Sequence, residues 1–190
     1  RGAAPRMTSD GGPRRGKCGA LTPIRCMIGP TGEESTMAGS AGIDLRDHLA
    51  PEQVIDLTAT VKDQALVEVV DAVARTDAVA SRDELLDAVR AREKILSTGI
   101  GLGIAIPHAR IGSVERFVVA VGRHPQGLDF ESIDQKPVHI VVLIAGPKDT
   151  QKPYLELLAQ LSKRLKLTDV RTRIREGASP DEVVDLLTER

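Results

Sequence analysis

The sequence predicts an α/β fold, a single-domain sandwich in which helices flank a central mixed β-sheet. Helical patterns occupy both ends of the ordered part of the chain, and strand-like segments lie between them. One of these segments, Val138 to Ala145, is apolar at nearly every position. Such a run is typical of a strand that is covered on both faces. Helices before and after buried strands indicate a sheet between helical layers.

Two adjacent helices are expected at the start of the ordered region. The first shows apolar residues at the i, i+3, i+4 and i+7 spacing of an amphipathic helix, namely Leu66, Val69, Val70 and Val73. The second is predicted by Ser81, which is followed three residues later by Glu84, as in a capping box.

The strand-forming region follows. Glycines at positions 99, 101 and 103 lead into the apolar segment 104–106, and segments 117–121 and 138–145 also predict strands. Alternate glycines leave one face of an extended segment without side chains. We therefore expect a second backbone or a ligand to approach this face closely.

Two further helices are expected after the strands. A helix from about Gln151 to Lys166 should pack on the sheet through an apolar stripe. The stripe consists of Tyr154, Leu158, Leu161 and Leu165, widened by Leu155 and Leu157. The last helix is predicted by the run from Ser179 to Glu182, a capping box with proline at the first helical position.

Residues 1–41 differ in composition from the rest. They hold 8 of the 17 glycines and 4 of the 11 prolines, and they show no apolar periodicity. We expect an extension that cannot order itself, followed by one domain over 42–190. Much of 1–36 is either derived from a vector or upstream translation, or a natural flexible tail. Cys18 and Cys26 fall here without a hydrophobic signal-peptide core, so we expect a cytoplasmic protein.

Composition argues against several classes of partner. The chain has 26 basic and 27 acidic residues and only three aromatic ones, Phe117, Phe130 and Tyr154. Neither a basic surface nor a stacking platform is predicted, so nucleic acid is not an expected partner. No apolar run approaches the ~20 residues of a spanning helix, and membrane insertion is not expected.

The most informative segment runs from Ser97 to Arg110. Its glycine spacing lacks the third glycine of a dinucleotide fingerprint and no Gly-Lys-Ser/Thr follows, so no nucleotide cofactor is predicted. The segment ends at Pro107-His108. The proline should end the strand and present the His108 ring at a sheet edge. A lone histidine in such a place is often structural or simply exposed.

Several motifs together resemble the type-2 enzyme IIA domains of the bacterial phosphotransferase system. The resemblance covers about Leu57 to the C-terminus and is closest to the nitrogen-regulatory branch, with the fructose branch next. The motifs are Arg92-Glu93, Thr98-Gly99-Ile100-Gly101, Gly103-Ile104-Ala105-Ile106-Pro107-His108, Gly127-Leu128-Asp129-Phe130 and Lys136-Pro137-Val138-His139.

The resemblance implies that His108 accepts a phosphoryl group from the histidine phosphocarrier protein or its nitrogen-branch equivalent. Most of an unperturbed histidine is neutral at pH 7, with a ring nitrogen free to attack phosphorus. The resemblance also implies that Arg92 stabilises the phosphoryl group and that His139 hydrogen-bonds His108 or the phosphate. The alternatives are a surface ion pair of Arg92 with Glu93 and an ordinary strand histidine at position 139.

Two outputs remain open. In the first, phosphorylation of His108 switches binding to a regulatory target, such as a transporter or a kinase; the nitrogen-like motif favours this output. Alternatively, His108 relays phosphoryl to the cysteine of a separate enzyme IIB for fructose or mannitol uptake, since no cysteine follows Cys26. We expect no metal, no cofactor and no free-standing enzyme activity. His48 and His124 are expected to be solvated, and Arg110 to contact phosphate or a partner, or to be solvated.

Overall fold

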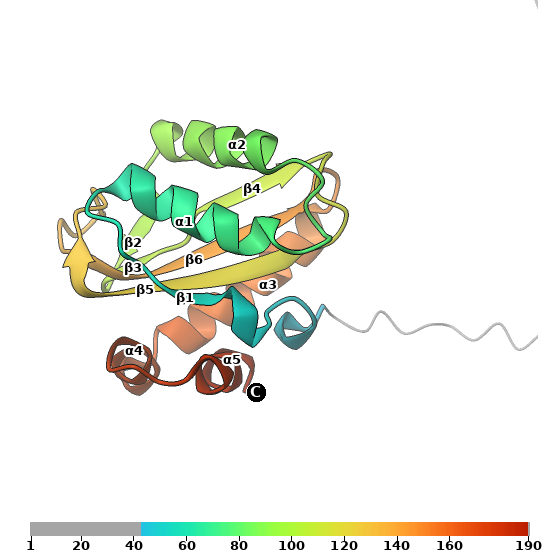
Figure 1. Cartoon of the computed structure of the whole chain (residues 1–190). Helices are drawn as coiled ribbons and strands as arrows, with labels where there is room; N and C mark the ends of the chain where they lie inside the picture. The colour runs from blue at the N-terminus through green and yellow to red at the C-terminus, as the bar shows by residue number, and fades with distance from the viewer. Residues whose placement is uncertain (1–42, 190) are drawn as a thin grey trace, which may run out of the picture. The chain divides into compact units, whose positions relative to one another are not determined.

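Six strands form one mixed sheet in the computed structural model of this chain, which describes residues 43–189 (Figure 1). The expectations for residues 1–41 lie outside this range. The strands are β1 (Val54–Asp56), β2 (Gly99–Gly101), β3 (Ile104–Ala105), β4 (His108–Ile111), β5 (Val118–Leu128) and β6 (Val138–Pro147). β6 lies at the centre, antiparallel to β5 and parallel to both β3 and β4.

Helices cover both faces of the sheet, which confirms the predicted sandwich (Figure 1). They are α1 (Lys62–Ala74) and α2 (Arg82–Ile95) on one face, and α3 (Gln151–Leu165), α4 (Thr168–Arg175) and α5 (Pro180–Thr188) on the other. Two 3-10 turns, Leu45–Asp47 and Pro51–Gln53, precede β1. None of the described helices is long and apolar enough to cross a bilayer.

Capping residues set the helix starts as predicted. The Ser81 side chain accepts a hydrogen bond from the Glu84 backbone N–H, which is half of a capping box. At α5 the box is complete, because Ser179 and Glu182 bond reciprocally and Pro180 takes the first position. These bonds satisfy N–H groups that have no partner inside the helix.

Two cores lie on opposite faces of the sheet. The predicted stripe of α1 packs with α2 against one face, around Phe130 and Leu143. The helices α3 to α5 pack against the other face, around Ile144 and Leu161. Leu155, expected to widen the α3 stripe, is instead 51% exposed because it points away from the sheet-facing side that holds Leu157 and Leu161.

The prediction of one extended glycine-rich segment is wrong. β2 and β3 form an antiparallel hairpin whose turn uses positive φ at Gly101, Leu102 and Gly103. Pro107 also interrupts the strand rather than ending it, because β4 resumes pairing with β6 at His108. The sequence did not predict the short helix α4, because only Val170 and Ile174 of its eight residues are buried.

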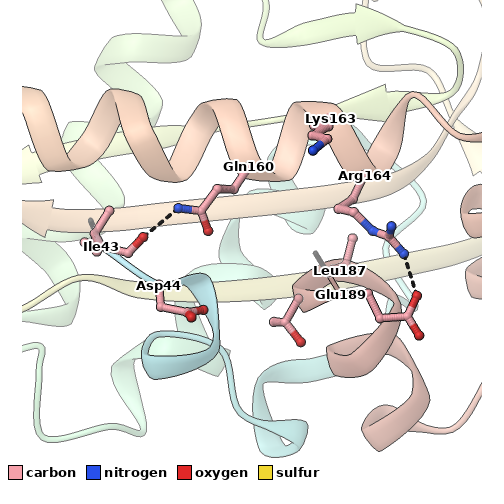
Figure 2. Close-up of a pocket in the computed structure, with 8 residues that line it drawn as sticks. Ile43, Asp44, Gln160, Lys163, Arg164, Leu187 and Glu189 are labelled. Carbon is pink, nitrogen blue, oxygen red and sulfur yellow. Dashed lines mark hydrogen bonds and ion pairs between the residues drawn. The ribbon is translucent and has the colours of Figure 1, made fainter. Parts of the chain in front are cut away.

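The described chain begins against α3 and α5. Gln160 donates a 2.6 Å hydrogen bond to the Ile43 carbonyl, and Arg164 pairs with Glu189 at 2.9 Å, beside a pocket of about 470 Å³ (Figure 2). Both contacts join segments that are far apart in the sequence, and they hold the two ends of the described chain against α3. The pocket beside them shares no lining residue with the pocket of His108.

One glycine fixes the packing beneath β4. Gly146 in β6 pairs with Arg110, and the buried Phe117 ring occupies the space where a Cβ would lie. We predict that Gly146→Ala lowers the free energy of unfolding by about 1–3 kcal/mol, because the ring must shift in a packed core. Gly112→Ala is the control, since nothing lies within 4 Å of its added Cβ. Equal melting temperatures for the two variants would contradict this packing.

Candidate functional site

His108 begins β4 and lies half-buried in a pocket of about 480 Å³. Within residues 43–189, β4 pairs with β6 alone, so its outer side carries no strand. Side chains from helices on both faces of the sheet can therefore reach the imidazole. The pocket is lined by Arg92, Leu96, Ser97, Thr98, Gly99, Ile100, Ile106, His108, Glu131, Ile133, Leu158 and Ser162.

Two hydrogen bonds fix the tautomer of His108. Its Nδ1 lies 3.0 Å from the carbonyl oxygen of Ile106, and a carbonyl only accepts. Its Nε2 lies 3.1 Å from Nε of Arg92, and a guanidinium only donates. The ring is therefore protonated on Nδ1 and carries its lone pair on Nε2. The unprotonated nitrogen of the ring therefore points at a cation.

The same surroundings favour the neutral ring. Burial lowers the pKa of His108 below its ordinary value. The hydrogen bond to the Ile106 carbonyl raises the pKa, whereas the positive charges of Arg92 and Arg110 lower it further. The net direction is downward, so Nε2 is free of a proton at neutral pH.

Arg92 lies in the last turn of α2. Its Nη1 donates a 2.9 Å hydrogen bond to the Leu96 carbonyl, just beyond the helix end, while its Nε faces His108. The alternative of a surface ion pair with Glu93 is wrong, because Glu93 is buried and binds other groups. Arg92 thus has donors left over to bind an anion beside His108.

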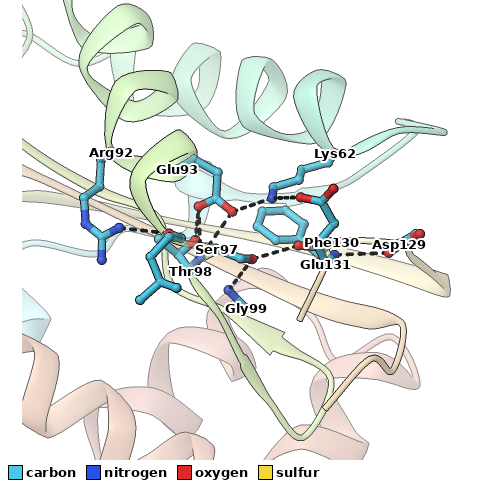
Figure 3. A network of polar contacts seen from close by, with 10 residues as sticks. Lys62, Arg92, Glu93, Ser97, Thr98, Gly99, Asp129, Phe130 and Glu131 are labelled. Atoms are coloured by element: carbon cyan, nitrogen blue, oxygen red, sulfur yellow. Dashed lines mark hydrogen bonds and ion pairs between the residues drawn. The ribbon is translucent and has the colours of Figure 1, made fainter. Parts of the chain in front are cut away.

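Glu93 is the centre of a polar network beside the site (Figure 3). Its carboxylate accepts hydrogen bonds from the backbone N–H of Thr98 and, at 2.5 Å, from the Thr98 hydroxyl. It also pairs with Lys62 at 2.8 Å, and Lys62 bridges to Glu131 at 2.9 Å. Burial would lower the pKa of Lys62, but the bonds to both carboxylates raise it. The charges are therefore retained and paired.

This network holds the loop that follows β5. Ser97 donates a 2.8 Å hydrogen bond to the Phe130 carbonyl, and the Gly99 carbonyl accepts a 3.0 Å bond from the N–H of Ile133. An added Cβ at Gly99 would lie 2.8 Å from the Ser132 backbone. The close approach predicted for the glycines is therefore confirmed at Gly99. One wall of the His108 pocket is built in this way.

A family model now gives these features a context. The model described as "Phosphoenolpyruvate-dependent sugar phosphotransferase system, EIIA 2" matches residues 48–190. The chain belongs to this EIIA family. The resemblance of its sequence motifs is thereby confirmed.

The relatives come from both branches that the motifs indicated. The fructose-specific EIIA component of Haloferax volcanii is 34% identical over 143 residues, which are 74% of this chain and 93% of that protein. The fructose-specific EIIABC component of Bacillus subtilis is 33% identical over 71% of this chain, which spans only 21% of that longer protein. The crystal structure of the nitrogen regulatory protein IIA-Ntr of Neisseria meningitidis matches with a TM-score of 0.71 and 27% identity, covering 76% of this chain and 99% of that one.

One residue of this EIIA domain at the site was predicted only as part of the α3 stripe. Tyr154 packs its ring against His108, with ring centroids 5.2 Å apart, and Arg110 lies over the same tyrosine ring. The stripe indicated that Tyr154 is buried, which it is. It carried no signal that the ring would face His108, because that contact depends on how α3 packs on the sheet.

The third predicted residue, His139, is not brought to His108. His108 pairs with Ile144, five residues along β6 from His139, or roughly 16 Å of strand. The Nδ1 of His139 donates to the His124 carbonyl at 3.0 Å, and its ring packs against Gly127. These contacts match the alternative of an ordinary strand histidine.

The prediction that His48 and His124 are solvated is wrong, because both side chains are half-buried. His48 is half-buried and donates from Nδ1 to the Phe117 carbonyl at 3.1 Å. His124 is also half-buried, because β5 continues to Leu128 instead of turning at Pro125. Within residues 43–189, no three side chains of the metal-ligating types gather as a potential site.

The electrostatics of the site predict a titration. His108 should titrate below its ordinary pKa of 6.5, and Arg92→Ala should raise that pKa without fully restoring it, because burial remains. Since the unfolded chain then binds the proton more readily, His108 lowers the stability of the fold as the pH falls through about 6.5. NMR titration of the ring protons measures the pKa.

The control for this titration is Arg90→Ala on the same helix. Arg90 pairs with Asp63 and makes no hydrogen bond to His108. A pKa of His108 at or above 6.5, or equal shifts in the two variants, would show that the ring is not held as described.

Proposed function

We propose that this chain is a phosphoryl carrier whose acceptor is Nε2 of His108, loaded by a phosphorylated histidine phosphocarrier protein. The observation that supports it best is the fixed tautomer, with Nδ1 bonded to the Ile106 carbonyl and Nε2 facing Arg92. An imidazole held neutral, with its lone pair beside a guanidinium, has the geometry that nucleophilic attack on an anionic phosphoryl group requires.

The proposed step needs no separate base. The Nε2 lone pair forms a bond to phosphorus while the bond between phosphorus and the donor breaks, and the donor atom takes the bonding pair. His108 keeps its proton on Nδ1, where the Ile106 carbonyl holds it. The product is therefore a phosphorylated imidazolium. Onward transfer reverses the step and returns the neutral ring.

Arg92 stabilises the phosphoryl group in this proposal. When Nε2 is used for the new bond, the Arg92 Nε–H loses its acceptor and is free to bind a phosphoryl oxygen. The bond from its Nη1 to the Leu96 carbonyl keeps the side chain close to the site. A charge-assisted bond of this kind contributes about 1.5–3 kcal/mol.

The surroundings of His108 suit a protein partner. Leu96, Ile100 and Ile133 line the same pocket and are 69%, 51% and 83% exposed. Exposed apolar side chains that cluster around a reactive group are typical of an interaction site. We infer that the donor and the acceptor proteins dock on these residues in turn, through small and transient interfaces.

Two outputs of the carrier are proposed. The nitrogen-like motifs and the similarity to IIA-Ntr favour a regulatory output in the cytoplasm, in which a transporter or a kinase distinguishes the phosphorylated from the unphosphorylated form. The 34% identity to a fructose-specific EIIA component supports relay to a separate enzyme IIB as the second candidate. If a partner other than the donor binds the phosphorylated and the unphosphorylated form with equal affinity, the regulatory output is excluded for that partner.

Phosphorylation tests the proposal directly. Incubation with phosphoenolpyruvate, enzyme I and the histidine phosphocarrier protein should add one phosphoryl mass, which acid removes because the bond is a phosphoramidate. His108→Ala should abolish the gain while the circular-dichroism spectrum stays unchanged. His139→Ala should still be labelled, because its ring contacts the His124 carbonyl rather than His108. Labelling of His108→Ala, or none of the wild type with competent donors, would overturn the assignment.

The role of Arg92 predicts a rate effect. Arg92→Ala should slow phosphorylation by about ten- to a hundredfold, because a charge-assisted bond is lost in the transition state. The phosphorylation rate of Arg92→Lys should lie between those of Arg92→Ala and the wild type, since lysine keeps the charge without the planar fork. Quench-flow labelling measures the rates, and Arg90→Ala is again the control. Unchanged rates for Arg92→Ala would remove Arg92 from the transfer step.

A further inference from the structure

Tyr154 is the only tyrosine of the chain and lies in the first turn of α3. Its ring centroid is 5.2 Å from that of His108, and the two ring planes are tilted by 37°. The residue is only 8% exposed, so the ring is fixed by the α3-side core. Such a contact restricts how the imidazole can rotate about its side-chain bonds.

We propose that Tyr154 is a positioning residue of the phosphoryl site, whose ring steadies the His108 imidazole and stabilises the positive charge that the ring gains on phosphorylation. The stabilisation of the positive charge rests on the proposed function. The steadying of the imidazole concerns the unphosphorylated protein and does not depend on that function.

The charges around His108 explain why such a residue is needed. Arg92 from α2 and Arg110 from β4 both disfavour a positive imidazole, and the Glu93 carboxylate, which favours it, is already bound to Lys62 and Thr98. From α3 the facing group is Tyr154, whose own pKa burial raises, so it stays a neutral phenol. The electron-rich face of an aromatic ring attracts a neighbouring cation without adding a charge.

Arg110 gives the tyrosine ring a second contact. Its guanidinium carbon lies 5.5 Å from the ring centroid, although the residue is exposed. Arg110 is also near enough to act electrostatically on His108, so in this proposal its guanidinium is available to a phosphoryl group on Nε2. Tyr154 thus serves the phosphorylated state twice, by facing the imidazolium and by keeping a donor near the phosphoryl oxygens.

Tyr154 contributes an aromatic ring to this contact, which gives a sharp test. Tyr154→Phe keeps the ring and Tyr154→Leu removes it. In the unphosphorylated protein, we expect Tyr154→Leu to raise the rate at which diethyl pyrocarbonate acylates His108 by about 2- to 12-fold, the range that corresponds to the loss of an aromatic ring pair. In the phosphorylated protein, where the imidazole is a cation, the half-life of phosphohistidine should shorten by about 2- to 30-fold, the range that corresponds to a ring–cation contact. Tyr154→Phe should match the wild type within about twofold in both measurements.

Phe117→Leu is the matched control, because it makes the same change from an aromatic residue to leucine in the same core. It should loosen that core without altering either rate at His108. The proposal is overturned if Tyr154→Leu behaves as the wild type, if Phe117→Leu gives the same increase, or if Tyr154→Phe behaves as Tyr154→Leu. If the wild type is never phosphorylated, the proposed function fails, whereas the acylation rates still decide whether Tyr154 positions His108.

Discussion

The site depends on one hydrogen bond, from Nδ1 of His108 to the carbonyl of Ile106. Pro107 has no N–H to donate, although its carbonyl accepts a 3.0 Å bond from the N–H of Ile144, and the Ile106 carbonyl before it accepts from the ring. Because a carbonyl can only accept, the proton must lie on Nδ1 and the lone pair on Nε2. The direction in which Arg92 faces the ring and the atom proposed to bind phosphorus follow from this constraint, whereas the neutral state of the ring follows from burial and from the nearby positive charges of Arg92 and Arg110.

A second constraint is the buried carboxylate of Glu93. A buried charge is tolerated only when it is paired and hydrogen-bonded, and Glu93 meets this condition through Lys62 and Thr98. These partners come from α1 and from the start of the β2–β3 hairpin, so the network joins both to the end of α2. It thereby fixes the helix turn that carries Arg92 and the loop that forms one wall of the pocket. Removing Lys62 would leave the Glu93 carboxylate buried without an opposite charge beside it.

Much of the fold could be predicted from the sequence, because periodicity and capping are local signals. The α1 stripe, the Ser179 cap and the buried β6 are examples. The pairing of His108 with Arg92 came from a resemblance to a family rather than from spacing. The contact of Tyr154 with His108 could not be predicted, because it depends on how α3 packs on the sheet. For His139 the sequence left two interpretations open, and the strand register decides between them. His139 matched a motif, yet strand register places it five residues from the partner of His108.

In the proposed mechanism, the tautomer of His108 directs phosphoryl transfer to Nε2. The most direct measurement is the one-bond coupling between phosphorus and nitrogen in the ¹⁵N-labelled, phosphorylated protein, observed by NMR. We expect the coupling to involve Nε2 of His108 while Nδ1 keeps its proton. Coupling to Nδ1, or to a nitrogen of any other residue, would contradict it.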